Sequence, residues 1–276
     1  MTPSASPTLD SQGASVEPGQ ELAVEQRGPV LWMTIQREAR RNAMSHAVLA
    51  GMSKAIADAQ TQRDVRAIVI TGAGTKAFCA GADLQSAKAF TTDYSEPIGH
   101  LAQLLRVAQA SCVPLIARVN GTCMAGGFGL LSMCDMAVSA HHAVFGLPEV
   151  KVGVFPAQVL SVLQHLIPRR VLNEMCLTGE PITAAQALQY NLVNYVQTAD
   201  ETDVDVRLNW LLERLLDKSP AAIRRGRYTM KKIESMAFEE SMSFTESQIA
   251  LFTLSDDAKE GQKAFQEKRK PNWTGH

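Results

Sequence analysis

The chain lacks any long apolar segment. Although 46% of its 276 residues are hydrophobic, no apolar run approaches the roughly 20 residues that a membrane-spanning helix needs. Neither sign of charge is in excess, because 27 basic and 28 acidic residues leave a formal net charge of -1. We therefore expect neither a membrane nor nucleic acid as a partner. The apolar content is high enough for a sizeable core.

Paired cysteine motifs are also missing. The five cysteines are Cys79, Cys112, Cys123, Cys134 and Cys176. Their spacing is scattered and no CxxC pair occurs, so neither a zinc site nor a disulfide framework is indicated, and we expect no metal. Reduced thiols are typical of a cytoplasmic protein, which is the expected location.

Residues 1–20 have neither the basic start and apolar middle of a signal peptide nor the arginines of a transit peptide. Their Ser, Pro, Gln and Gly content predicts a disordered N-terminal tail. We expect an α/β core over residues 21–200 and a helical region over residues 201–276.

Local patterns support this division. Residues 21–26 and 30–36 predict a hairpin, and Ser45 is a good N-cap for a following helix. Short buried strands are predicted at 67–71, 113–119 and 137–140. Strands that alternate with helical segments favour a largely parallel sheet flanked by helices. After residue 200, helical periodicity occurs in segments beginning near residues 204, 220, 238 and 256, and no strand pattern is visible there.

Two glycine-containing loops, residues 76–84 and 120–127, each follow a strand and are each predicted to open a helix. The first N–H groups of a helix have no intrahelical partner and can stabilise negative charge. Small residues let a ligand approach the backbone closely. The alternative is that both loops are ordinary tight turns. Neither is a GxGxxG fingerprint or a Walker A loop.

Several motifs, in a fixed order, resemble the enoyl-CoA hydratase/isomerase (crotonase) family over about residues 22–273. The three strongest are FCAGADL at 78–84, NG…GG…CD at 120–135 and FGLPEVKVG at 145–153. Weaker matches are RRNAMS at 40–45, the TG…A…LV stretch at 178–193 and AFQEKR at 264–269.

The resemblance implies a crotonase-like spiral of ββα units with a helical C-terminal trimerisation region, in a homotrimer or dimer of trimers. It also implies an acyl-CoA substrate, with coenzyme A as part of the substrate and no other cofactor. An oxyanion hole would use the backbone amides of Ala82 and Gly126. The CoA moiety would contact Ala80, Leu84, Arg40 or Arg41, and Lys268, the last from a neighbouring subunit. For the basic residues, a solvated surface is the alternative.

Glu149 matches one of the two catalytic glutamates of the family, and a partly buried glutamate there is expected to have a raised pKa. Gly129 occupies the position of the second glutamate. Proton removal beside a thioester puts charge on the thioester oxygen, which two fixed N–H donors would hold. One carboxylate is sufficient for moving a double bond, whereas hydration normally uses two.

A single-glutamate site therefore favours double-bond isomerisation. The alternatives are an enoyl-CoA hydratase of low or specialised activity, a non-catalytic acyl-CoA-binding homologue and a thioester hydrolase. Cys79 and Cys123, in the two loops, are expected to be small buried residues because no histidine lies at a telling spacing.

Overall fold

The computed structural model describes residues 20–83, 98–201 and 203–276. The predicted tail, except for Gln20, and the predicted CoA contact Leu84 lie outside these residues. A six-stranded sheet runs through the chain in the order β1-β2-β3-β5-β7-β10. Its strands are β1 Leu22–Arg27, β2 Val30–Ile35, β3 Ala67–Gly72, β5 Leu115–Val119, β7 Met136–Ser139 and β10 Tyr195–Val196. Only the first pair is antiparallel.

The first elements form as the sequence predicts. Gly28, with a φ of +54°, lies in the turn between β1 and β2, a conformation that glycine adopts without steric conflict. The side chain of Ser45 accepts a hydrogen bond from the Val48 amide and caps α1, His46–Ala59. This helix buries an apolar face that includes Val48, Met52 and Ile56, which follows helical spacing.

A second sheet, in the order β4-β6-β8-β9, was not predicted. Its strands are β4 Ala77–Cys79, β6 Thr122–Met124, β8 Val144–Gly146 and β9 Ile182–Thr183. The prediction was therefore wrong where it treated residues 77–79 and 122–124 as loop. Segments of three residues are too short for a periodic pattern, and their strand character depends on partners distant in the sequence.

The two sheets account for the predicted spiral of ββα units. β5, β6 and α3, Gly126–Ser132, form one complete ββα unit, and β3 with β4 begins the unit before it. The pair β7 and β8 is followed by the 3₁₀-helix η2, Pro148–Val152, and by α4, Ala157–Leu163. The predicted α/β architecture, with a largely parallel sheet flanked by helices, is confirmed.

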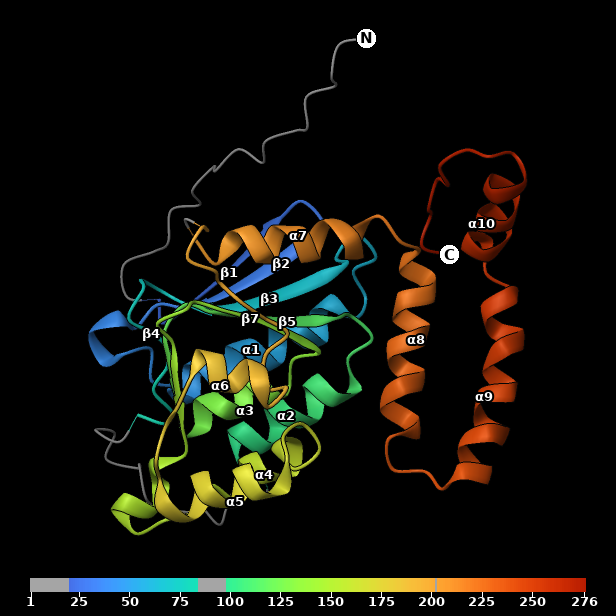
Figure 1. Cartoon of the computed structure of the whole chain (residues 1–276). Helices are drawn as coiled ribbons and strands as arrows, with labels where there is room; N and C mark the ends of the chain where they lie inside the picture. The colour runs from blue at the N-terminus through green and yellow to red at the C-terminus, as the bar shows by residue number, and fades with distance from the viewer. Residues whose placement is uncertain (1–19, 84–97, 202) are drawn as a thin grey trace.

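Side chains on opposite faces of the main sheet enter two apolar clusters. Val69 of β3 packs with Leu208 and Leu212 of α7, Asp205–Leu216. Its neighbours Ile68 and Ile70 point to the other face, because strand side chains alternate. That face is covered by α1, α3 and α2, His100–Ala110, so helices flank the sheet on both sides (Figure 1).

Further helices complete the chain. They are α5 Arg169–Thr178, α6 Ala184–Gln189, α8 Pro220–Ile233, α9 Phe238–Thr253 and α10 Asp256–Gln266. The last three stand beside the α/β core (Figure 1). None of the described helices combines the length and the apolar character that a membrane span requires.

A buried arginine attaches α8 to the core. Arg227 is 2% exposed and its Nε donates to Asp135 Oδ2 at 2.7 Å. Its Nη2 donates to the Ala108 carbonyl at 3.1 Å, and Nη1 donates to the Ser111 carbonyl. Asp135 Oδ2 also accepts from the Leu115 amide at 2.8 Å. Asp135 is therefore the acceptor through which α8 and β5 are joined.

Candidate active site

The first predicted amide donor, Ala82, follows β4. The Met44 amide donates to the Gly81 carbonyl at 2.8 Å, and the Asp83 amide donates to the Met44 carbonyl at 3.0 Å. These bonds flank Ala82 and leave its own N–H without an acceptor among the described residues. Because C=O and N–H point in opposite directions in a trans peptide, the Ala82 N–H points away from Met44.

The second predicted donor, Gly126, is the first residue of α3. The preceding residue is held on both sides, because the Ala125 amide donates to the Gly146 carbonyl at 2.9 Å and its carbonyl accepts from the Phe128 amide at 2.9 Å. Gly126 N–H has no acceptor within the described part of the chain. Since α3 has only seven residues, the free N–H group matters more here than the helix dipole.

The two predicted donors lie close together because β4 pairs with β6. A Cβ placed on Gly126 would lie 3.8 Å from the Ala82 nitrogen, and a Cβ placed on Gly81 would lie 3.3 Å from the Gly126 nitrogen. A Cβ on Gly127 would lie 2.5 Å from the Cys79 carbonyl oxygen. The glycines therefore permit a backbone approach that larger residues would prevent.

Two buried asparagines, whose role the sequence analysis missed, hold the turn that leads into β4. Asn42 Nδ2 donates to the carbonyl oxygens of Ala73 and Ala77 at 3.0 and 2.7 Å. Asn120 Nδ2 donates to Gly74 and Ala77 at 2.7 and 3.2 Å. Both side chains thus converge on the Ala77 carbonyl and anchor the segment that ends in Ala82. The motifs that contain these asparagines were the available signal.

An ion pair beside Ala82 was also missed. Arg37 Nη2 lies 2.6 Å from Asp83 Oδ2, and the two side chains are only 11% and 15% exposed. Arg37 Nη1 also donates to the Ala43 carbonyl at 2.5 Å, and its Nε lies 2.9 Å from Glu21 Oε1. The guanidinium thereby ties the residue after Ala82 to the end of β2 and to the start of α1.

Glu149 lies on η2, just after β8. Gly146, at the end of β8, accepts a hydrogen bond from the Ala125 amide. Glu149 therefore follows, by three residues, a residue that contacts the loop of Gly126. Its Oε2 is buried and has no hydrogen-bond partner among the described residues. Burial raises the pKa of this half-buried carboxyl, as the sequence predicted, because desolvation disfavours the charged form.

Gly129, one turn beyond Gly126, faces an apolar surface. A Cβ at this position would meet Leu101 Cδ1 at 3.5 Å, Val159 Cγ2 at 3.7 Å and Leu105 Cδ2 at 3.9 Å. All three distances are ordinary van der Waals contacts. The position therefore has room for a methyl group, and the atoms nearest to it are the methyl groups of three aliphatic side chains.

The predicted CoA contacts fall into two places. Arg40 is half exposed, and its Nη1 lies 4.0 Å from Asp83 Oδ1. The Arg41 carbonyl accepts from the Ala80 amide at 3.1 Å, which brings Arg41 and Ala80 together. Lys268 follows α10, which lies across the molecule from β4 (Figure 1).

Two buried thiols lie in the paired strands β4 and β6. Cys79 and Cys123 are both fully buried, as predicted, and burial raises the pKa of Cys79 to about 12. Burial also raises the pKa of Cys123. At neutral pH these thiols stay protonated and are poor nucleophiles. The described residues contain no cluster of three or more metal-ligating side chains.

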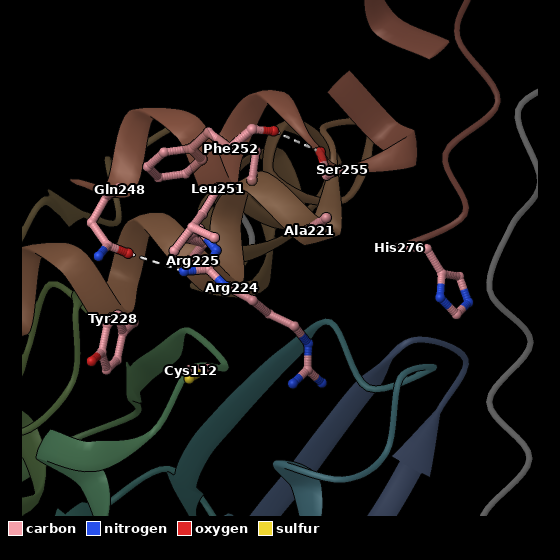
Figure 2. Close-up of a pocket in the computed structure, with 12 residues that line it drawn as sticks. Cys112, Ala221, Arg224, Arg225, Tyr228, Gln248, Leu251, Phe252, Ser255 and His276 are labelled. Carbon is pink, nitrogen blue, oxygen red and sulfur yellow. Dashed lines mark hydrogen bonds between the residues drawn. The ribbon is translucent and has the colours of Figure 1, made fainter. Parts of the chain in front are cut away.

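A cavity of about 590 Å³ lies elsewhere, where α8 and α9 face the loop at Cys112 (Figure 2). Arg225 Nη1 donates to Gln248 Oε1 at 3.0 Å across it. Arg224 extends toward the core (Figure 2), where it donates to the carbonyls of Gln60 and Val65 after α1. This arginine joins α8 to the core, and the cavity lining includes none of the predicted site residues.

The two loops that pair through β4 and β6 are the features to compare with known proteins. The chain matches the family model "Enoyl-CoA hydratase/isomerase" over residues 25–276. It is 33% identical to carnitinyl-CoA dehydratase of Salmonella arizonae over 266 residues, covering 93% of this chain and 99% of the relative. It is also 33% identical to 2,3-dehydroadipyl-CoA hydratase of Escherichia coli, with 92% and 99% covered.

A solved enoyl-CoA hydratase from Mycobacterium smegmatis superposes with a TM-score of 0.85 at 30% identity, covering 92% of this chain and 99% of that one. An enoyl-CoA hydratase from Bacillus anthracis gives the same TM-score at 26% identity, with 93% and 100% covered. The chain therefore belongs to the enoyl-CoA hydratase/isomerase family, and it is an enzyme of the crotonase superfamily.

Proposed function

We propose that this enzyme moves the double bond of an unsaturated acyl-CoA thioester, with Glu149 as its single acid/base. The Glu149 carboxylate takes a proton from C2 of a 3-enoyl-CoA, which forms a dienolate with its charge on the thioester oxygen. The protonated Glu149 then returns that proton to C4, which yields a 2-enoyl-CoA. The reaction needs no cofactor beyond the coenzyme A of the substrate.

The observation that carries this proposal is the buried Oε2 of Glu149, which has no protein partner among the described residues. A buried polar atom without a partner is unfavourable in a folded protein and is a common sign of a functional site. Its raised pKa suits a group that must both accept and return a proton. Glu149 Oε2 is therefore available to accept a proton from the substrate.

Two amides would hold the negative charge that develops in the reaction. The N–H groups of Ala82 and Gly126 lack acceptors among the described residues, and the loops that carry them are in contact. One donor of this kind can contribute about 3–4 kcal/mol to the transition state. The free N–H groups and the proximity of the loops support an oxyanion hole at this point.

The surroundings of Gly129 favour isomerisation over hydration. Methyl groups of Leu101, Leu105 and Val159 line this position, so these nearest groups offer a water molecule no hydrogen bonds. An ordered water needs two to four polar partners. Low or specialised hydratase activity is the alternative, because the relatives in Salmonella and E. coli are named as a dehydratase and a hydratase.

A panel of 2-enoyl-CoAs and 3-enoyl-CoAs tests the proposal, with products read by mass and by double-bond position. Isomerisation leaves the mass unchanged, hydration adds one water, and thioester hydrolysis releases free CoA. We expect isomerisation that is lost in Glu149→Gln. Glu180→Gln is the matched control, because Glu180 is exposed and pairs with Lys151 at 2.9 Å. Robust hydration, or CoA binding without turnover, would contradict the proposal.

We further propose that Arg40, Arg41 and the backbone of Ala80 contact the CoA moiety. The Arg41 and Ala80 backbones are hydrogen-bonded to each other, and Arg40 is half exposed beside Asp83. Arg40→Ala should therefore raise KM for every acyl-CoA while kcat changes little. An unchanged KM would mean that this guanidinium is only solvated.

We also propose that Lys268 joins these contacts from a neighbouring subunit, and the surface of α8–α10 supports an oligomer. Several large apolar residues on these helices, or directly after one of them, are at least 60% exposed; they are Met230, Phe238, Ile249, Leu254 and Phe265. Apolar surface of this kind is typical of subunit contacts. We therefore propose a homotrimer or a dimer of trimers, which light scattering of the purified chain will distinguish from a monomer.

A further inference from the structure

Ala125 has a backbone conformation that alanine normally avoids. Its φ is 51° and its ψ is -127°, which corresponds to the first central residue of a type II′ turn, a position that favours glycine. Arg41, another residue with positive φ, has a ψ of 37° and lies in the ordinary left-handed region. The conformation of Ala125 is therefore strained in a way that the left-handed conformation of Arg41 is not.

Two hydrogen bonds and one close contact restrain Ala125 in this conformation. Its N–H donates to the Gly146 carbonyl and its C=O accepts from the Phe128 N–H, both at 2.9 Å. Its methyl group lies against Gly81, where an added Cβ would come within 2.8 Å of the Ala125 Cβ. Gly81 itself has a φ of 97°. The second sheet, α3 and the first loop therefore all constrain one residue.

This residue directly precedes the amide of Gly126. Because the peptide unit is planar, the ψ of Ala125 sets the direction of the Gly126 N–H. The methyl of Ala125 and the Gly126 nitrogen both lie near Gly81, the residue before Ala82, because a Cβ on Gly81 would come within 2.8 and 3.3 Å of them. The alanine is thus placed to control both the direction of one proposed donor and its separation from the other.

We propose that Ala125 is a positioning residue for the oxyanion site, and that its strained backbone and its methyl group hold the Gly126 amide in the orientation that the enolate needs. The inference rests on the proposed role of that amide. Glycine at this position would adopt the same φ and ψ without strain, but it would remove the methyl contact with Gly81 and widen the range of accessible ψ.

The test is Ala125→Gly in the full-length enzyme. We expect a melting temperature equal to that of the wild type or higher by about 2–4 °C, because strain is relieved. We expect kcat to fall about 10- to 100-fold, because a small misalignment weakens a transition-state donor. KM should change little. Ala125→Ser, which keeps Cβ, should retain a kcat close to that of the wild type.

Asn191→Gly is the matched control. Asn191 also has positive φ, at 65°, and it follows α6 in an exposed position. Replacement of this exposed residue by glycine should leave kcat unchanged. A purely structural role for Ala125 predicts instead that any loss of activity accompanies a loss of stability.

A second readout does not depend on turnover. The enolate of acetoacetyl-CoA carries charge on the thioester oxygen, so its ultraviolet absorbance when bound reports on the proposed donors. Ala125→Gly should weaken enolate binding by a factor similar to its effect on kcat. Equal enolate affinity in the wild type and in Ala125→Gly would overturn the inference, and so would a parallel fall in melting temperature and kcat. Absence of any Glu149-dependent turnover in the wild type would contradict the proposed function alone.

Discussion

Replacement of Glu149 by glutamine should lower kcat strongly and also stabilise the protein. The substitution keeps the size of the side chain and removes its charge. As the sole base, the carboxylate is expected to contribute about 10²–10⁴-fold to kcat. The stability effect follows from the buried Oε2, which has no partner among the described residues. A buried polar atom of this kind costs about 1–3 kcal/mol.

We expect a gain in the free energy of unfolding of about 1 kcal/mol, because Glu149 is only half buried and the glutamine amide must also be desolvated. The gain should depend on pH. Burial raises the pKa of Glu149 in the folded state, so the folded protein binds this proton more tightly than the unfolded chain does. The wild type therefore loses stability relative to the variant as pH rises through the folded-state pKa.

The assay is urea unfolding of both proteins from about pH 4, near the unfolded pKa of glutamate, to pH 8. The two free energies should converge at the acid end and separate toward neutral pH. The same raised pKa should place the acid limb of the wild-type kcat/KM profile above the ordinary pKa of a glutamate. A variant that is less stable at neutral pH, or a difference that does not change with pH, would refute the reasoning.

Three other substitutions test neighbouring parts of the molecule. Arg227→Ala should lower the free energy of unfolding by about 3–5 kcal/mol, measured by urea titration, because it leaves Asp135 without its buried partner; a loss below 1 kcal/mol would contradict this. Asn120→Ala should destabilise the chain by about 1–3 kcal/mol. At urea concentrations below the unfolding transition it should also reduce kcat more than Arg227→Ala does, because it loosens the turn before Ala82. Gly129→Glu should not acquire the ability to hydrate 2-enoyl-CoAs, because a carboxyl surrounded by methyl groups stays protonated. Addition of water by this variant would show that the position accepts an ionised carboxylate.

Features that depend on neighbours in the sequence were predictable. The Ser45 cap, the hairpin around Gly28 and the main parallel strands each have a local signal, such as a capping residue, a turn or an apolar run. The raised pKa of Glu149 was also predictable, because partial burial is sufficient to shift the pKa of a carboxyl.

Features that depend on distant partners were not. The strands at 77–79 and 122–124 are recognisable only through their pairing with each other. The ion pair of Arg37 with Asp83 joins residues 46 positions apart, and nothing in the sequence around either residue indicates the other. The strain at Ala125 is hidden for a different reason, since alanine is not a residue that marks positive φ.

The two proposed donors depend on different kinds of support, and this difference predicts how the site tolerates change. The segment of Ala82 is held by side chains, through Asn120 and the ion pair of Asp83, so their removal should reduce stability and activity together. The Gly126 amide is held by a strained backbone at Ala125, whose relief should raise stability while it lowers activity. The sign of the stability change therefore separates two kinds of residue. Loss of stability marks residues that build the site, and gain of stability marks residues that hold it in a reactive geometry, as expected where strain is maintained for function.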